Sequence, residues 1–505
     1  MQLIFKTDLK DLDKSEILIT TLTKDGLKKI TSKSSTKTES LLSKLNKSYA
    51  GRISSRLSNS DFEGNFGQTV SFDIIDVSKK PLRLVIIGWN SESKNEFENV
   101  NQYRQLGALV QSLSKRAQVT TPTLAAEDLD WSKDLNQEAF IEGALLSGYT
   151  YTKYKSTKDK KIPSIQKVLI HTKKFSKNSN HQLINSFCTA TFLARDLVNL
   201  APNDCPPAEL VKTAKQIARN QRLEIKVFNR AALKKMGAGG ILGVSMASAF
   251  EPYLIKLSYK SKNKNAKKVA LVGKGVTFDS GGLSIKTGVG METMKCDMSG
   301  AAAVLGAMSM IRDLAPNYNV TAYIPTVENM IAANALRPGD IIKHMNGKTS
   351  EILNTDAEGR LILADALTLS AKDQNDIVID LATLTGACVV ALGNDYAGIF
   401  SNNKELSDEL ILAAENEGER LWPMPLAPEY ASSLKSTVAD LKNIGSRSGG
   451  GAITAALYLE NFIDKSKKWA HLDIAGPAFR EGDSDLSKSG GVGFGVRTLL
   501  RFLSK

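Results

Sequence analysis

The sequence predicts an α/β protein in which a smaller N-terminal α/β domain precedes a larger domain with a mostly parallel central sheet covered by helices. Two observations lead to this expectation. The chain has 505 residues, which is enough for roughly two to four domains. In its second half, almost continuously apolar runs alternate with helical patterns, as is typical of parallel strands that are buried on both faces.

The N-terminal part alternates short apolar runs with longer helical patterns. Residues 17–20, 72–77 and 82–87 predict strands, and residues 102–117 and 136–146 predict helices. This alternation is typical of a small α/β domain.

Residues 150–180 are rich in Lys, Ser and Thr and contain one strand-like run, 168–171. Such a composition is typical of a domain boundary. We therefore place the N-terminal domain at residues 1–170, a linker at 171–190 and the larger domain at 191–505.

The larger domain begins with a helical pattern at 187–200, which ends just before Pro202. Beyond it, strands and helices alternate. The predicted strands are 269–272, 320–327 and 377–381, and the predicted helices are 299–314 and 359–370. In such sheets, ligands bind beyond the carboxyl ends of the strands, so the functional residues are expected there.

Composition excludes several classes of protein. With 42% hydrophobic and 24% charged residues, the chain is not a disordered one, and four cysteines are too few for a disulfide scaffold. The first ten residues lack the layout of a signal peptide. The most apolar long stretch, 377–393, contains Asp380 and several Thr and Gly residues, which favours a buried strand and loop over a membrane span. We expect a cytoplasmic protein with no membrane contact.

The net charge of +13 is concentrated in the N-terminal part, because residues 1–190 carry 29 Lys and Arg against 20 Asp and Glu. Residues 153–177 contain nine lysines, and Asp159 is the only acidic residue among them. Such a run suits a solvated linker or an anionic partner such as DNA. Lysine outnumbers arginine, whereas bidentate phosphate recognition uses arginine, so the linker is the preferred interpretation.

Motifs of several common enzyme classes are absent. The sequence has no HExxH, no paired CxxC, no GxSxG and no GxGxxG, and its four histidines are scattered. Gly347-Lys348-Thr349 resembles the end of a phosphate loop, but Ile342 stands where that loop requires glycine. Serine hydrolases, dinucleotide enzymes and P-loop NTPases are therefore disfavoured.

Acidic and basic residues gather in the turns at the ends of the predicted strands of the larger domain. They are Lys274, Asp279, Lys286, Asp297, Asp356, Glu358 and Arg360. An isolated buried carboxylate is unfavourable, and the carboxyl ends of parallel strands meet at one edge of a sheet. We therefore expect these groups to share one site.

Each of these residues also has a structural interpretation. Asp297 and Asp356 fit as N-caps, Thr355 with Glu358 fits a capping box, Asp279 fits a glycine turn, and the cations fit structural ion pairs. Together they favour a shared site, because four carboxylates without histidine suit Mg²⁺, Mn²⁺ or Zn²⁺ and suffice for two ions. Two such ions activate water and polarise a carbonyl or phosphoryl oxygen. The residues thus predict a two-metal hydrolase without selecting the bond that it cleaves.

The octapeptide at 354–361, Asn-Thr-Asp-Ala-Glu-Gly-Arg-Leu, resembles the signature of the leucyl (cytosol) aminopeptidase family. The likeness extends from residue 195 to the C-terminus. It is carried by the segments 272–297, 328–329, 337–340, 380–387 and 471–476. In the N-terminal domain it is limited to size and order, and that domain is expected to serve assembly or regulation.

By this resemblance, residues 191–505 form the catalytic domain of a dinuclear metallopeptidase. It would remove N-terminal residues, preferentially leucine and other large apolar ones, by means of a metal-bridged water. Lys286 would stabilise the oxyanion of the substrate, and Arg360 would hold a bicarbonate that acts as general base. The resemblance assigns the metal ligands Lys274, Asp279, Asp297, Asp356 and Glu358, and the substrate-binding residues Lys286, Met294, Asn354, Thr383 and Leu384.

The resemblance also implies two divalent ions per subunit, Mn²⁺ or Zn²⁺ with Mg²⁺ or Co²⁺ as alternatives, and a homohexamer that acts on peptides. Two other functions stay open. One is a two-metal phosphoesterase. The other is a DNA-binding regulatory protein with secondary peptidase activity, for which the basic N-terminal part is suited.

Overall fold

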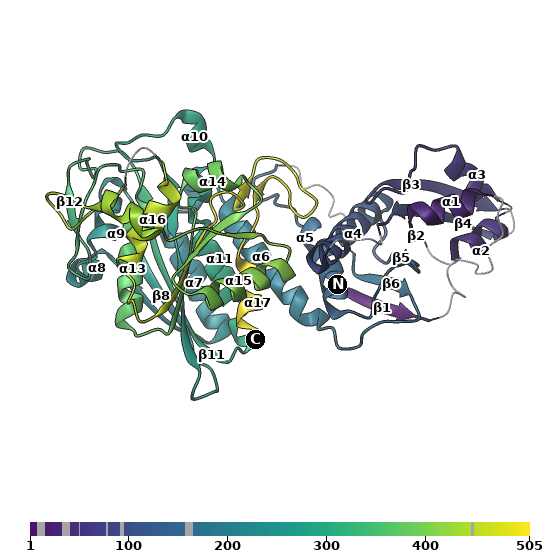
Figure 1. Ribbon diagram of the computed structural model, residues 1–505, viewed down its shortest axis with the longest axis horizontal. Coiled ribbons are helices and arrows are strands. Elements are labelled where there is room, and N and C mark those ends of the chain that lie inside the picture. The colour runs from purple at the N-terminus through teal and green to yellow at the C-terminus, as the bar shows by residue number, and fades with distance from the viewer. Residues whose placement is uncertain are drawn as a thin grey trace. The chain divides into compact units, whose positions relative to one another are not determined.

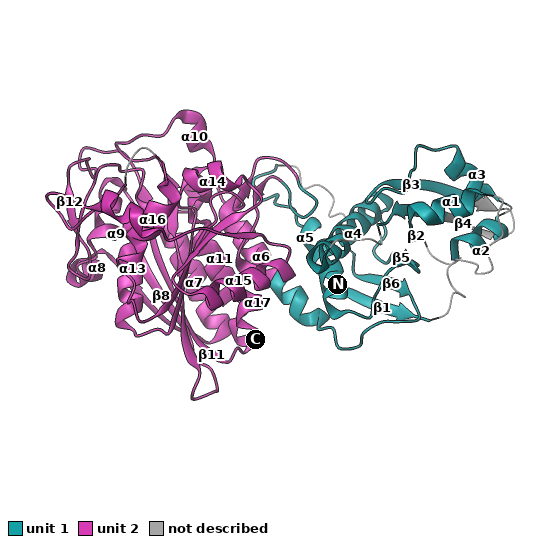
Figure 2. Ribbon diagram, in the orientation of Figure 1, with its two compact units in different colours: residues 1–188, 484–488 teal, residues 189–483, 489–505 magenta. Residues whose placement is uncertain are grey.

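The computed structural model describes residues 1–7, 16–32, 41–49, 51–76, 79–90, 95–156, 165–445 and 449–504 (Figure 1). The chain divides into two units (Figure 2). Unit 1 comprises residues 1–188 and 484–488, and unit 2 comprises residues 189–483 and 489–505. Three lysines of the basic run, Lys158, Lys160 and Lys161, lie outside the described residues.

Unit 1 is built on a six-stranded sheet in the order β1-β6-β5-β2-β4-β3, in which β3 alone runs antiparallel to its neighbour. The predicted strands and helices of this part are all present, with somewhat different ends. The strands are β1 (Gln2–Lys6), β2 (Ile17–Leu22), β3 (Thr69–Asp76), β4 (Lys79–Gly88), β5 (Thr123–Leu124) and β6 (Lys167–His171). The helices are α1 (Lys24–Thr31), α2 (Leu41–Ser48), α3 (Arg52–Ser58), α4 (Glu96–Ala117) and α5 (Asp134–Ser147).

Helices α4 and α5 pack against each other at very short range. A Cβ atom at Gly143 would lie 1.7 Å from the carbonyl oxygen of Arg104, so only glycine permits this approach. The buried Arg104 guanidinium pairs with Glu142 across the same contact, at 2.8 Å. Because both charges are buried, each depends on the other for compensation.

Unit 2 is built on a nine-stranded sheet in the order β16-β15-β18-β14-β9-β11-β8-β7, with β10 paired to β11. Its central strands are parallel, whereas β15 pairs antiparallel to β18, and β8 runs antiparallel to both β11 and β7. This confirms the predicted, mostly parallel central sheet. The strands are β7 (Glu224–Phe228), β8 (Tyr253–Tyr259), β9 (Lys267–Gly273), β10 (Gly275–Asp279), β11 (Tyr318–Asn329), β14 (Ile377–Ala382), β15 (Ala397–Ser401), β16 (Leu421–Pro423) and β18 (Lys468–Asp473).

Helices cover both faces of this sheet (Figure 1). On one face, helix α13 packs against β9 and β11, helix α9 packs against β11 and α13, and helix α16 packs against α13. Helices α7, α11 and α17 form the layer on the opposite face. The helices of this part of the chain are α6 (His181–Asn199), α7 (Pro207–Gln221), α8 (Arg230–Met236), α9 (Gly239–Val244), α10 (Gly288–Glu292), α11 (Ser299–Met308), α12 (Ile311–Leu314), α13 (Gly359–Lys372), α14 (Gly386–Leu392), α15 (Lys404–Asn416), α16 (Gly451–Glu460) and α17 (Val496–Leu503). The single helix expected at 299–314 is divided between α11 and α12.

Short elements complete unit 2. They are the 3-10 helices η2 (Pro202–Asp204), η3 (Ser245–Ala247), η4 (Met294–Met298) and η5 (Pro428–Leu434), and the strands β12 (Ile341–Lys343), β13 (Thr349–Glu351), β17 (Leu441–Lys442), β19 (Phe479–Arg480) and β20 (Gly490–Gly491). Helix α6 crosses the point between Cys188 and Thr189 at which the chain passes from one unit to the other. The domain limits at 170 and 190 stay a prediction. No helix within the described ranges is both long and apolar enough to cross a membrane.

Candidate metal centre

Acidic side chains converge where the central strands of unit 2 end. Asp279 is the last residue of β10, whereas Asp356 and Glu358 lie in the turn that leads into α13. Each of the three carboxylates offers an oxygen within 4.8 Å of the others. The sheet places them together because β10 and α13 meet at one edge, as the sequence led us to expect.

Lys274 lies at the centre of this cluster, in the single-residue break between β9 and β10. Its buried ammonium is 2.7 Å from Asp297 Oδ1 and 2.9 Å from Glu358 Oε1, and it donates to the carbonyl oxygen of Thr383 at 2.9 Å. The adjoining backbone comes very close, since a Cβ at Gly359 would lie 2.5 Å from Lys274 Cε. Lys274 therefore joins Asp297 to Glu358, which is one of the three clustered acids.

Lys286 bridges the opposite side of the cluster. Its Nζ lies 3.0 Å from Asp279 Oδ2 and 2.5 Å from Asp356 Oδ1, and its side chain is partly exposed. Asp279 Oδ1 accepts hydrogen bonds from the backbone of Gly281 and from Asn329 Nδ2. The glycine-turn role considered for Asp279 is thus present alongside its place in the cluster.

The capping roles considered for the other acids are absent. Helix α13 begins after Glu358 and helix α11 begins after Met298, and neither helix has a side-chain hydrogen bond at its N-cap. Thr355 Oγ1 instead donates to the carbonyl oxygen of Gly281 and accepts from the backbone of Ser284. These acids therefore face the cluster and do not serve the helix ends.

The electrostatics of the cluster call for additional positive charge. Burial raises the pKa of Asp279 to about 7, assisted by the charge of Glu358, and burial also raises the pKa values of Asp297 and Asp356. Burial would raise the pKa of Glu358 too, but Lys274 holds it below its ordinary value. Four carboxylates facing two ammonium groups leave two negative charges in excess. Divalent cations would compensate that excess.

One buried atom points to the same conclusion. Asp297 Oδ2 has no hydrogen-bond partner within the described part of the chain. A buried carboxylate oxygen without a partner is costly, and a coordinated cation would satisfy it. The acids therefore fit a metal centre.

The charge of Lys274 bears on its role as a metal ligand. Burial alone would lower the pKa of Lys274, but Asp297, Glu358 and Asp279 raise it above its ordinary value. Beside these carboxylates the side chain is an ammonium ion, whereas a metal ligand must be a neutral amine. Cation binding at this residue must therefore displace its proton.

Arg360 is buried beside the cluster but does not contact it directly. Its Nη1 donates to the backbone oxygen of Asn443 at 2.7 Å, and within the described ranges its Nε has no hydrogen-bond partner. Burial lowers the pKa of the guanidinium. A buried cationic donor without a partner fits a small anion such as bicarbonate.

The predicted substrate-binding residues take different positions. Thr383 Oγ1 donates to Asp297 Oδ1 at 2.8 Å, so this residue belongs to the cluster. Asn354 uses its side-chain oxygen to accept from the backbone of Asp356, within its own turn. Met294 lies in η4, and Leu384 follows Thr383 on the rim of the core. In the residues that the structure describes, no hydrogen bond or ion pair joins Met294 or Leu384 to Asp279, Asp297, Asp356 or Glu358.

Three buried residues that organise the centre were not singled out as site residues from the sequence. Asn329, at the end of β11, donates to both Asp279 Oδ1 and the carbonyl oxygen of Thr355. Asp473, at the end of β18, accepts from the backbone of Leu384 and from Thr385 Oγ1. Both are polar residues that end buried strands, a signal that sequence reasoning could have used. Asn443, which fixes the backbone at Asn354, follows a two-residue strand and gave no such signal.

Comparison with known proteins shows to which family this chain belongs. The sequence model of the cytosol aminopeptidase family's catalytic domain matches residues 192–500, and that of its N-terminal domain matches residues 29–158. The chain belongs to the cytosol aminopeptidase family. The N-terminal match goes beyond the likeness of size and order recognised in the sequence. The protein is therefore an aminopeptidase, a hydrolase of peptide bonds, from a metal-dependent family.

Relatives from this family match along most of the chain. A probable cytosol aminopeptidase of Prochlorococcus marinus (strain MIT 9215) is 41% identical over 445 residues, which is 88% of this chain and 89% of the relative. One from Alkaliphilus oremlandii (strain OhILAs) is 40% identical over 456 residues, or 89% and 90% of the two chains.

Solved structures also resemble this chain along nearly its whole length. A mutant of tomato leucine aminopeptidase has a TM-score of 0.86 at 33% identity and covers 100% of this chain and 96% of its own. The bottromycin maturation enzyme BotP in complex with Mn has a TM-score of 0.80 at 32% identity, with 97% and 99% covered. The two-domain α/β fold of the family is thus present here.

Asn329 allows a test of how this aminopeptidase holds its acids in place. We expect Asn329→Ala to lower metal affinity and kcat by about 10- to 100-fold, because Asp279 loses the donor that orients it. Metal titration and peptidase assays at saturating metal would measure both values. Asn346→Ala, which alters an exposed asparagine of the same unit, serves as the control. Unchanged metal affinity and kcat in Asn329→Ala would contradict the orienting role.

Proposed function

We propose that this enzyme is a dinuclear metal-dependent aminopeptidase that removes N-terminal residues, preferentially leucine and other large apolar ones, from peptides. The observation that carries the proposal is the buried cluster of four carboxylates around Lys274, with two negative charges in excess. Membership of a metal-dependent peptidase family supports the same activity.

We assign two divalent ions, Mn²⁺ or Zn²⁺, to Lys274, Asp279, Asp297, Asp356 and Glu358. When bound, such ions lower the pKa of a water and polarise the scissile carbonyl. The excess negative charge supports this assignment, as does Asp297 Oδ2, for which the described part of the chain offers no hydrogen-bond partner. The manganese complex of the structural neighbour BotP supports manganese as one of the ions.

Two cationic side chains are assigned to the reaction itself. Lys286 donates a hydrogen bond to the carbonyl oxygen of the substrate as negative charge develops there. Its partly exposed side chain at the edge of the acidic cluster supports this role. Arg360 holds a bicarbonate that serves as general base. This role is supported by its buried Nε, which has no hydrogen-bond partner among the described residues.

Specificity is assigned to the residues that flank the cluster. Thr383 and Asn354 would bind the substrate backbone, and Met294 and Leu384 would face its first side chain. The contact of Thr383 with Asp297 supports a position beside the scissile bond. We further propose that the enzyme acts in the cytoplasm, in line with the family's name and the names of its relatives. As a homohexamer is what the sequence resemblance implies, we propose that assembly as well.

Metal removal and reconstitution test the proposal. After chelation and dialysis we expect hydrolysis of leucine p-nitroanilide to disappear and to return with two Mn²⁺ or Zn²⁺ per chain, together with release of protons. Leucine p-nitroanilide should be cleaved faster than the glutamate analogue, and p-nitrophenyl phosphate should not be cleaved. Light scattering on the same sample would check the hexamer. Full turnover in metal-free enzyme, or faster cleavage of the phosphate ester, would contradict the proposed function.

A further inference from the structure

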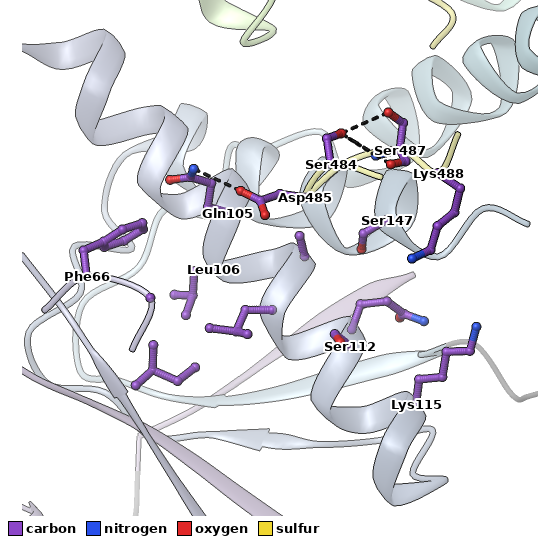
Figure 3. A pocket seen from close by; sticks show the side chains of 15 residues that line it. Phe66, Gln105, Leu106, Ser112, Lys115, Ser147, Ser484, Asp485, Ser487 and Lys488 are labelled. Carbon is purple, nitrogen blue, oxygen red and sulfur yellow. Dashed lines mark hydrogen bonds between the residues drawn. The ribbon is translucent and has the colours of Figure 1, made fainter. Parts of the chain in front are cut away.

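Unit 1 contains a cavity of about 510 Å³, remote from the acidic cluster in sequence and formed by residues of unit 1 alone. Helix α4 provides one wall through successive turns of a single face, including Leu106, Leu109 and Ser112. The segment 484–488 lines the cavity as well, and its Asp485 accepts a hydrogen bond from Gln105 Nε2 at 3.2 Å (Figure 3). The volume lies in the range of small-molecule sites.

The two ends of the cavity differ in chemistry. Phe66 and Leu106 lie at one end, whereas Lys115, Ser147 and Lys488 lie at the other (Figure 3). Ile87 and Leu109 add further apolar surface, and Ser112 lies near the basic end. Asp485 is the single acid among the lining residues that the structure describes, where positive charge exceeds negative charge. The cavity therefore suits a molecule that is apolar at one end and anionic at the other.

A polar side chain of α4 also lines the cavity. Gln111 is only 5% exposed, and its Oε1 accepts a hydrogen bond from the backbone of Ile165 at 3.4 Å. Its amide also carries a hydrogen-bond donor, Nε2, which suits an anionic ligand. Gln111 and Lys115 lie one helical turn apart on α4, so both can reach one carboxylate.

We propose that this cavity binds a small carboxylate with an apolar tail. The carboxylate lies against Lys115 and Gln111, and the tail lies against Phe66 and Leu106. A free amino acid with a large apolar side chain and an aliphatic or aryl acid share this chemistry. The proposal concerns unit 1 alone and is independent of the function assigned to the metal centre.

Calorimetric titration of the full-length protein with 3-phenylpropanoate tests the proposal. We expect one molecule bound per chain and, for Lys115→Met, a loss of affinity of about 10- to 100-fold, because a charge-assisted hydrogen bond is removed. Arg116→Met carries the same change of charge at the next residue, which does not line the cavity, and should bind as the wild type does. The neutral 3-phenylpropan-1-ol should bind at least about tenfold more weakly than the acid.

Two further arms make the result decisive. Leu109→Trp, which fills the cavity, should abolish binding without changing peptidase activity, so a failure of this proposal is separable from a failure of the metal centre. Titration with L-phenylalanine distinguishes the two classes of ligand. Tighter binding than that of 3-phenylpropanoate would identify free amino acids as the ligands, and weaker binding would identify acids without an amino group. No binding of 3-phenylpropanoate, or equal affinity in wild type and Lys115→Met, would overturn the proposal.

Discussion

Replacement of Glu358 by glutamine is expected to lower kcat/KM for leucine p-nitroanilide on the order of 10³-fold, equivalent to about 4 kcal/mol. Glu358 lies within reach of both Asp279 and Asp356, and its Oε1 contacts Lys274 at 2.9 Å. Glutamine keeps the volume and one oxygen but removes a negative charge from the cluster. The metal content that survives dialysis should fall together with activity.

A matched variant separates this effect from a general change of charge. Glu415→Gln removes an exposed carboxylate of α15 in the same unit and should keep both the activity and the metal content of the wild type. Elemental analysis after dialysis and initial rates at saturating Mn²⁺ would report the two quantities. If Glu358→Gln retained the wild-type rate and metal content, Glu358 would have no place among the ligands.

Lys274→Met is expected to destabilise the metal-free protein by about 3–5 kcal/mol, because Asp297 and Glu358 lose their buried counter-charge. Without Lys274, burial is expected to hold the pKa values of Asp297 and Glu358 above those of the unfolded chain, so the folded variant retains protons that its unfolded state releases. The loss of stability relative to the wild type should therefore be smallest at about pH 5 and should grow as the pH rises toward about 7, where Asp279 titrates.

Thermal unfolding in EDTA and in Mn²⁺ would measure this effect. Mn²⁺ binds the folded state through the remaining carboxylates, so it should recover part of the lost stability. Lys404→Met removes an exposed lysine that pairs with Asp408 and should leave the unfolding temperature almost unchanged. An unfolding temperature of Lys274→Met equal to that of the wild type in EDTA would show that the ammonium does not stabilise the cluster.

The elements that the sequence predicted best are those with strong local patterns. The apolar run at 377–381 became β14, buried at every position, because a fully buried strand has no polar face to obscure it. The position of the acids followed from the same reasoning, since turns after parallel strands meet at one edge. Helix α11 ends at Met308, earlier than its small apolar residues suggested, because apolar composition does not mark where a helix ends.

Other features depend on contacts between distant residues and could not be predicted from one sequence. Asn443 is hydrogen-bonded to both Arg360 and Asn354. It follows β17, a strand of a small sheet, and such a short strand has no recognisable alternation of apolar and polar residues in the sequence. Gln111 is polar in a helix that otherwise looks amphipathic, and its burial follows from the packing of its neighbours. The charge of Lys274 depends on which ions surround it, which sequence spacing does not specify.

The short segment 484–488 affects how this architecture can be recombined. Because these five residues belong to unit 1 although they follow most of unit 2, the polypeptide passes between the units three times. A single crossover between two related genes, anywhere from residue 105 to residue 485, would separate Asp485 from its native hydrogen-bond donor, Gln105. A chimaera that exchanges unit 1 therefore has to exchange the segment 484–488 with it.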